Sequence, residues 1–191
     1  MAQAALEAGA EVVAAARGPE RTARLAELGA QLVVDYGERD WAATVRERYD
    51  GVTLVHDGVG GVVGRAALEL LAPGGRLAMF GYSSGGPTRL DTDDLVDRGI
   101  TAGWLLGPRM AALPGGIPGL ARRSLDRLAA GRWRPLVSTY PLAEAARAHA
   151  DLEGRRALGK VVLVPEPAAT TRPATNPVAT VGPDLQTGGH R

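Results

Sequence analysis

The sequence contains no cysteine, which excludes disulfide bonds, thiolate catalysis and zinc sites built on cysteine ligands. Its histidines, His56, His149 and His190, are too scattered to form a local metal-binding motif, so we expect no metal site. Basic and acidic residues nearly cancel, at 22 and 21, which gives no electrostatic reason to expect nucleic acid or an anionic membrane as a partner. No apolar run reaches the length of a membrane span, and the first residues lack the pattern of a signal peptide, so we expect a cytoplasmic protein.

Lysine and aromatic residues are also scarce. Lys160 is the only lysine, so arginine supplies nearly all of the positive charge, and a single arginine is weak evidence for a binding site. What the sequence does contain is 45% hydrophobic residues over 191 positions, which is enough for a compact domain with a core and an additional segment.

Short apolar segments alternate with amphipathic segments along most of the chain. The apolar segments, which we predict to be strands, are residues 11–16, 31–35, 52–57, 76–81 and 100–106. The amphipathic segments, which we predict to be helices, are residues 2–7, 19–28, 40–48, 62–71 and 109–130. This alternation predicts an α/β fold with a doubly wound parallel sheet whose faces are both covered by helices.

The two ends of the chain depart from this alternation. A helix that leads into a parallel strand normally follows another strand, so we expect residues 2–7 to be the second half of a helix inside a βαβ unit. Beyond Gly131 we predict a strand near residues 136–139, a helix over 142–153 and a strand over 160–164. Residues 166–191 are rich in proline, threonine and glycine and poor in large apolar residues, which predicts a disordered tail.

The most visible glycine motif is Gly58-Val-Gly60-Gly61-Val-Val-Gly64, which follows a predicted strand and opens a predicted helix. Two interpretations are open: a loop whose backbone N–H groups cradle a phosphate, or a tight strand-to-helix turn beside a ligand. The spacing favours the turn, because Val63 occupies the place of the third glycine of a dinucleotide fingerprint.

The segment after the first predicted strand has arginines where NAD-binding sheets carry an acid. A carboxylate at this position accepts from the ribose hydroxyls of NAD, whereas Arg17 and Arg21 match the chemistry of the 2′-phosphate of NADP. The alternative is that both arginines are solvated surface residues. Tyr36, directly after the second predicted strand, offers a flat face and a hydroxyl near the same crevice, or is a loop aromatic.

No catalytic constellation is visible in the sequence. We interpret His56 as a packed or capping residue, the segment 91–94 as the capped first turn of a helix, and Leu71-Ala-Pro-Gly-Gly as a helix-to-strand turn. The small residues after Phe80 form a loop that could accept a flat ligand.

Residues 2–165 resemble the C-terminal half of the medium-chain dehydrogenase/reductase superfamily, in the quinone oxidoreductase-like branch of its zinc-binding dehydrogenases. The segments that carry the resemblance, in this order, are ALEAGAEVVAAAR, LAELGAQLVVDY, VHDGVGG, LELLAPGGRLAMFGYSSG, RGITAGWLL, RPLVSTYPLAEAARAHADLE and GKVVLVP.

The resemblance implies a Rossmann-like sheet of strand order 3-2-1-4-5-6 that is truncated here, without its first, central strand and the glycine-rich turn. It assigns residues 1–134 to a partial dinucleotide-binding domain and residues 135–165 to a return segment of the catalytic domain. That domain, which carries the substrate pocket and, in alcohol dehydrogenases, the zinc ligands, has no counterpart here, so we carry over no zinc site.

The resemblance also implies NADP(H) as the cofactor and hydride transfer to a quinone or enone. It places Arg17, Arg21 and Tyr36 at the adenosine phosphate, and Gly58 and Val59 beneath the cofactor. It places Phe80, Gly81, Tyr82 and Ser83 near the nicotinamide, together with Trp104, Leu105 and Leu106, and it adds Lys160 as a further cofactor contact.

From the same resemblance we expect the full-length protein to form a homodimer through residues 100–106, and the isolated chain to be inactive. Two alternatives remain: a non-catalytic remnant or interaction module, and a methyltransferase-like domain. The methyltransferase reading requires a glycine turn and an acid that the sequence lacks at the corresponding positions.

Overall fold

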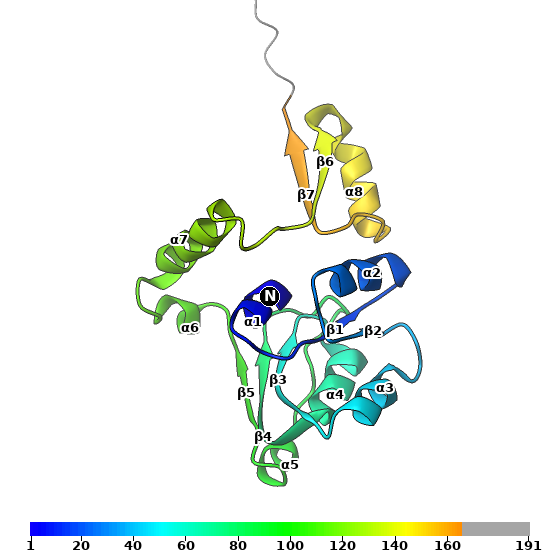
Figure 1. Cartoon of the computed structure of the whole chain (residues 1–191), viewed down its shortest axis with the longest axis vertical. Helices are drawn as coiled ribbons and strands as arrows, with labels where there is room; N and C mark the ends of the chain where they lie inside the picture. Colours follow the sequence, from blue (N-terminus) through cyan, green and yellow to red (C-terminus); the bar gives the residue numbers. More distant parts are fainter. Residues whose placement is uncertain (166–191) are drawn as a thin grey trace, which may run out of the picture. The chain divides into compact units, whose positions relative to one another are not determined.

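The computed structural model describes residues 1–165 and confirms the predicted alternation of parallel strands and helices (Figure 1). The strands are β1 (Val13–Ala16), β2 (Leu32–Asp35), β3 (Val52–Asp57), β4 (Leu71–Met79), β5 (Thr101–Trp104), β6 (Val137–Pro141) and β7 (Lys160–Val164). The helices are α1 (Ala2–Glu7), α2 (Pro19–Glu27), α3 (Trp41–Arg48), α4 (Gly61–Glu69), α5 (Thr92–Val96), α6 (Pro108–Ala111), α7 (Gly116–Ala129) and α8 (Ala145–Glu153), with a 3-10 turn, η1 (Leu142–Glu144). The predicted tail, residues 166–191, lies outside the described residues.

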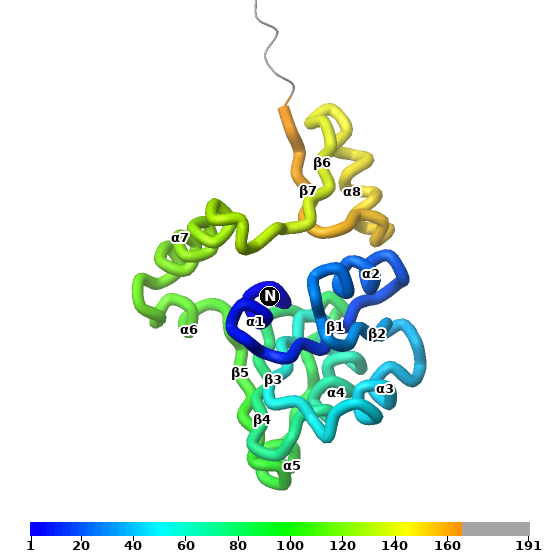
Figure 2. The backbone as a smooth tube through the Cα atoms, in the orientation of Figure 1, coloured from blue at the N-terminus to red at the C-terminus, as the bar shows by residue number. Residues whose placement is uncertain are grey.

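The described chain forms two compact units, residues 1–135 and a second unit that begins at Leu136. In the first unit, β1 pairs with β2, and β3, β4 and β5 form a separate three-stranded sheet, all in parallel orientation. Within residues 1–165 no strand pairing joins β1 to β3. The path of the backbone through these strands can be followed in Figure 2.

Both sheets of the first unit share one hydrophobic core. Its centre consists of Val34, Trp41, Val45 and Leu70, which are all buried. Val13 of β1 and Val52 of β3 pack against this same cluster. The two sheets are therefore held together by side-chain packing under α3 and α4, although their backbones do not pair.

A second core cluster covers one face of β3–β4–β5, and the opposite face is largely open. Leu68, Leu71, Leu77 and Ile100 are buried on the covered side. Val55 of β3 packs against this cluster, whereas its neighbour Leu54 is 46% exposed. The expectation that both faces are covered is therefore wrong for this face. It forms part of a cavity of about 300 Å³ that is lined by all three strands and by Arg109 of α6.

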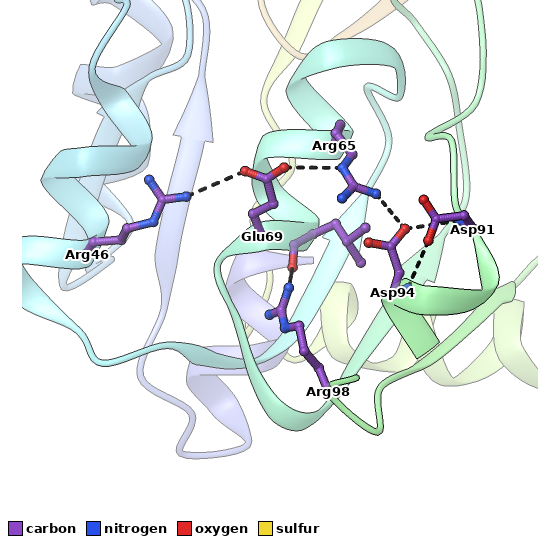
Figure 3. A network of polar contacts seen from close by, with 7 residues as sticks. Arg46, Arg65, Glu69, Asp91, Asp94 and Arg98 are labelled. Atoms are coloured by element: carbon purple, nitrogen blue, oxygen red, sulfur yellow. Dashed lines mark hydrogen bonds and ion pairs between the residues drawn. The ribbon is translucent and has the colours of Figure 1, made fainter. Parts of the chain in front are cut away.

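An ion-pair network ties the helices of the covered side together (Figure 3). Arg46 of α3 lies 3.7 Å from Glu69 of α4, and Glu69 also accepts from Arg65 at 3.2 Å. Arg65 also forms an ion pair with Asp94, which lies in the first turn of α5, and Asp91 is the N-cap of that helix. The Asp91 and Asp94 side chains form a reciprocal capping box, which confirms the predicted helix start.

Two predicted boundaries in this unit are wrong. The predicted helix over residues 109–130 is divided into α6 and α7, because Pro114 cannot continue a helix and Gly115 and Gly116 both have positive φ. The predicted turn over residues 71–75 belongs to β4. The register of β4 against β3 shifts there, since Val52 pairs with Leu71 and Leu54 pairs with Arg76.

The second unit is a small βαβ arrangement. β6 and β7 pair in parallel over residues 137–141 and 160–164, and α8 lies between them in the chain. Tyr140 is buried, and its hydroxyl donates to Asp151 at 3.0 Å. The strands and helix predicted in this segment are confirmed within a few residues.

Candidate functional site

The carboxyl ends of β1 and β2 bring Arg17, Arg21 and Tyr36 together. Ala16 stands opposite Asp35 in the ladder, and the Tyr36 N–H donates to the Ala16 carbonyl at 2.9 Å. Arg17 follows β1 directly and is exposed, and Arg21, one turn into α2, lies with Nη1 3.4 Å from the Arg17 carbonyl. Tyr36 is half-buried and packs on the first core cluster. The edge of these two strands therefore carries two guanidinium groups and a phenol.

Asp35, the last residue of β2, fastens the two loops of this edge. One carboxylate oxygen accepts from the Gly18 N–H at 2.9 Å, and the other accepts from the Gly37 N–H at 2.7 Å. A methyl group added to Gly37 would lie 3.4 Å from Cγ of Arg17, so the stem of that arginine runs over the second loop. Sequence reasoning missed Asp35, because one of its two partners is 17 residues away.

The loops after β3 and β4 lie against each other at the ends of the three-stranded sheet. A methyl group on Gly58 would lie 2.6 Å from Cζ of Phe80, so this ring packs directly on the glycine. The Ser83 N–H donates to the Gly58 carbonyl at 3.2 Å, and a methyl group on Gly81 would lie 2.9 Å from the same oxygen. The predicted residues of the two loops are thus brought into contact.

Two exposed aromatic rings stand at this edge. Tyr82, in the loop after β4, and Trp104, the last residue of β5, have ring centroids 6.0 Å apart and are 53% and 40% exposed. The Leu105 N–H donates to the Met79 carbonyl at 2.8 Å, which brings the end of β5 to the same place, and Leu106 follows with 40% exposure. The ring planes are tilted by 36° to each other, so each ring offers its own face to a planar ligand.

Asp57, the last residue of β3, decides between the two interpretations of the glycine motif. It is 4% exposed, and one of its oxygens accepts from the N–H groups of Val59 and Gly60, both at 2.9 Å. The next N–H, of Gly61, donates to the Gly86 carbonyl at 3.0 Å. Because these three N–H groups are engaged inside the protein, the geometry favours a tight turn over a phosphate cradle.

The remaining carboxylate oxygen of Asp57 joins this turn to a distant segment. It accepts from the Thr88 hydroxyl at 2.5 Å, and Thr88 is buried as well. The two residues are 31 positions apart, so no local pattern in the sequence could show this contact.

The other candidate residues lie elsewhere. Lys160 begins β7 in the second unit, where its N–H donates to the Leu136 carbonyl. The interpretation of His56 as packed or capping is wrong, because its side chain is exposed and lines the cavity on the open face. Partial removal of its ring from water, followed by the nearby Met1 ammonium, lowers the pKa of His56 below its ordinary value.

The part of the chain that the structure describes contains no set of side chains that could bind a metal ion. No group of three or more histidine and acidic side chains comes together there in a way that could hold a metal ion. Within residues 1–165, no helix is both long and apolar enough to cross a membrane.

A family described as zinc-binding dehydrogenase matches residues 28–163. A 2-haloacrylate reductase from Burkholderia is 32% identical over 168 residues, which is 83% of this chain and 49% of the relative. A quinone oxidoreductase from Pseudomonas aeruginosa is 30% identical over 163 residues, which is 82% of this chain and 50% of the relative. The chain therefore spans about half the length of the curated relatives it matches.

Solved structures give the same result. A quinone oxidoreductase from Pseudomonas syringae superposes with a TM-score of 0.74 at 28% identity, covering 86% of this chain and 52% of that one. A mycobacterial protein solved in complex with NADPH superposes with a TM-score of 0.73 at 33% identity, covering 86% of this chain and 53% of that one.

Proposed function

This chain belongs to the zinc-binding dehydrogenase family, in its quinone oxidoreductase-like branch, and on that premise we propose that it carries the adenosine part and the nicotinamide floor of an NADPH site. When bound, the cofactor supplies a hydride, and we propose a quinone or an enone as its acceptor. The family membership removes the methyltransferase alternative.

The single observation that carries the cofactor proposal is the position of Arg17, Arg21 and Tyr36 at one strand edge. Guanidinium groups bind phosphate through charge-assisted hydrogen bonds, and the N-terminus of α2 adds the positive end of a helix dipole. The acid at this edge, Asp35, ends β2, and its carboxylate accepts from two backbone N–H groups, whereas the position directly after β1, where an NAD site carries its acid, is Arg17.

The second part of the proposed site is the edge formed by β3, β4 and β5. Here the nicotinamide would lie against Gly58, Val59 and the loop from Phe80 to Ser83, with Tyr82 and Trp104 as flat neighbours. The engaged N–H groups of the glycine turn do not bind the pyrophosphate. We assign pyrophosphate binding to another strand and its turn, which would lie between β1 and β3. In the family's order 3-2-1-4-5-6, that strand is number 1, and β2, β1, β3, β4 and β5 correspond to numbers 3, 2, 4, 5 and 6.

This assignment implies that hydride transfer needs more than the described residues. The family's name refers to zinc, but the donor groups in residues 1–165 do not fit a metal ion, so the proposal contains no step through zinc. We propose that the chain alone binds the adenosine half of NADPH and has no quinone reductase activity.

We also propose that the family protein associates as a homodimer through the outer edge of β5. The Leu105 N–H is directed to β4, so the alternate residues Ala102 and Trp104 direct their backbone groups outward. In full-length protein, Ala102→Pro removes one outward N–H and is expected to give a monomer by light scattering, whereas Ala102→Val keeps the dimer. A monomeric parent protein, or a dimeric proline variant, would contradict this interface.

The cofactor proposal is tested by replacing both phosphate-binding arginines. The double variant Arg17→Ala/Arg21→Ala removes contacts worth about 1.5–3 kcal/mol each, so binding of NADPH weakens strongly while binding of NADH is unchanged. The control is Arg24→Ala, a third arginine of the same helix that is paired with Glu27 on the exposed side.

Calorimetric titration of each variant with NADPH and NADH gives the result. An unchanged ratio of the two affinities in the double variant would contradict the assignment. A folded parent chain that is indifferent to NADPH would favour the interaction-module alternative.

A further inference from the structure

We infer that Asp35 is a positioning residue for recognition of the 2′-phosphate: its carboxylate holds the loop that carries Arg17 and the loop that carries Tyr36 in the geometry that a phosphate requires. The inference rests on the proposed NADPH site and adds to it a residue that does not itself touch the phosphate.

The geometry shows a bridge between two loops. Asp35 reaches back from the end of β2 to the Gly18 N–H at 2.9 Å and forward to the Gly37 N–H at 2.7 Å. Gly18 is the N-cap of α2, and α2 has no side-chain capping bond of its own. Asp35 therefore fixes the start of the helix that carries Arg21, and it does so from the neighbouring strand.

The conformation of Gly18 explains why this loop needs an external hold. Its φ is 91°, in the region that favours glycine, and nothing lies within 4 Å of where a side chain would begin. Glycine is required there by backbone geometry alone, since packing does not restrain the position. Hydrogen bonds restrain the position instead: the Gly18 carbonyl accepts from Thr22 within α2, and Asp35 supplies the bond from outside the helix, at the N–H next to Arg17.

The second Asp35 bond, to the Gly37 N–H, fixes the loop on which the aliphatic part of the Arg17 side chain lies. The Gly37 N–H is bound to Asp35, and the Arg17 side chain runs over Gly37, with Cγ 3.4 Å and Nε 3.7 Å from the position of an added methyl group. Tyr36 lies in the chain between Asp35 and Gly37, and its own N–H donates to the Ala16 carbonyl. One carboxylate thus orients both the arginine and the tyrosine of the edge.

The sign of the charge effect separates positioning from simple electrostatics. A carboxylate close to a phosphate repels it, so removal of the negative charge alone strengthens binding of a phosphate. Positioning predicts the opposite, because loops released from Asp35 no longer present the guanidinium in its bound geometry. Asp40 supplies the matched control: it lies in the same connection between β2 and α3, is exposed, and makes no capping hydrogen bond with its side chain.

The experiment compares the affinities of the complete 191-residue chain for adenosine 2′,5′-bisphosphate and for adenosine 5′-monophosphate, which differ only in the 2′-phosphate. The parent chain, Asp35→Asn, Asp35→Ala and Asp40→Asn are titrated by calorimetry, and each is melted in parallel. We expect the preference for the bisphosphate to fall about tenfold in Asp35→Ala, less in Asp35→Asn, and not at all in Asp40→Asn.

Each other outcome overturns the inference. If both Asp35 variants keep the parent preference and only melt at a lower temperature, Asp35 is structural alone. If Asp40→Asn loses the preference equally, the effect is one of local charge. Should Asp35→Ala not fold, Asp35→Asn, which preserves the shape of the side chain, decides by the same criterion. A parent chain without any preference for the bisphosphate overturns the proposed NADPH site and this inference with it, so the two failures are distinguishable.

Discussion

Two strands of the first unit end in aspartate, Asp35 on β2 and Asp57 on β3, and the two carboxylates serve different purposes. Asp57 is 4% exposed and binds three donors, two from its own turn and one from Thr88. Asp35 is half-buried and binds two backbone N–H groups from the loops beside it. The same residue type at the same position of a strand therefore closes a buried turn at one edge and bridges two partly exposed loops at the other.

The surroundings of each carboxylate explain this difference. Around Asp57, further backbone bonds join the two loops, among them Ser84 N–H to the Val59 carbonyl and Gly61 N–H to the Gly86 carbonyl. Around Asp35, the residues at the edge are the exposed Arg17 and the half-buried Tyr36. Many backbone contacts join the loops of the β3–β5 edge, whereas the Asp35 carboxylate and the Tyr36 N–H, which donates to the Ala16 carbonyl, join those of the β1–β2 edge.

The largest effect is expected where a side chain would enter the Asp57 site. In Gly64→Ala the new methyl group overlaps the Thr88 hydroxyl and comes within 2.5 Å of the Asp57 carboxylate. We expect a loss of about 3–5 kcal/mol in the free energy of unfolding, even though alanine is the better helix former.

The control is Gly86→Ala, because no atom lies within 4 Å of the position that the added methyl group takes. Urea titrations of both variants measure the free energy of unfolding, and Gly86→Ala should change it by no more than about 0.5 kcal/mol. Equal stabilities of the two variants would show that the Asp57 site is not tightly packed.

A direct comparison of the two carboxylates comes next in size. Asp57→Ala leaves the buried donors of Gly60 and Thr88 and the part-buried N–H of Val59 without a partner, at a cost of about 2–4 kcal/mol. Asp35→Ala should cost about 1 kcal/mol, because the released N–H groups of its half-exposed loops can reach water. Denaturant unfolding of both variants measures the difference. A larger loss for Asp35→Ala would reverse the account of the two edges.

At both edges the sequence predicts the strands but not the carboxylate contacts that join distant segments. The strands and the placement of Arg17 and Tyr36 follow from apolar runs and from the rule that parallel strands end at one edge, whereas Trp104 is assigned to the site through the family resemblance. The Asp57–Thr88 contact spans 31 residues and the Asp35–Gly18 contact spans 17, so neither leaves a local pattern.

The break between α6 and α7, in contrast, has a local signal in the sequence that was not used in the prediction. Its signals, Pro114, Gly115 and Gly116, are visible in the sequence, but helical periodicity on both sides led to a single helix over 109–130. The unpaired edges of β1 and β3 follow from topology and could be anticipated only through the family resemblance.

A smaller effect concerns acid, and on the β3–β5 side it involves Asp94. The Arg65 guanidinium, and then a backbone N–H at Asp91, hold the pKa of Asp94 below its ordinary value of 3.8. Since the folded-state pKa is the lower one, this stabilisation is present above about pH 4 and is lost as the pH falls through the folded value.

Thermal melts between pH 5 and pH 2.5 test this assignment. The melting temperature of Asp94→Asn should depend less on pH than that of the parent chain, and Asp93→Asn, in the first turn of the same helix, should behave as the parent does. Parallel pH profiles for the parent and Asp94→Asn would remove Asp94 from the account of acid stability.

Recognition of the 2′-phosphate of NADPH by the β1–β2 edge, as proposed above, is tested most directly by the affinity of the unaltered chain for NADPH and for NADH. Two charge-assisted contacts from Arg17 and Arg21 predict that NADPH binds at least about tenfold more tightly in a calorimetric titration at low salt. The preference should shrink as salt is raised, because exposed charges are screened. Equal affinities for the two nucleotides, or tighter binding of NADH, would contradict the claim.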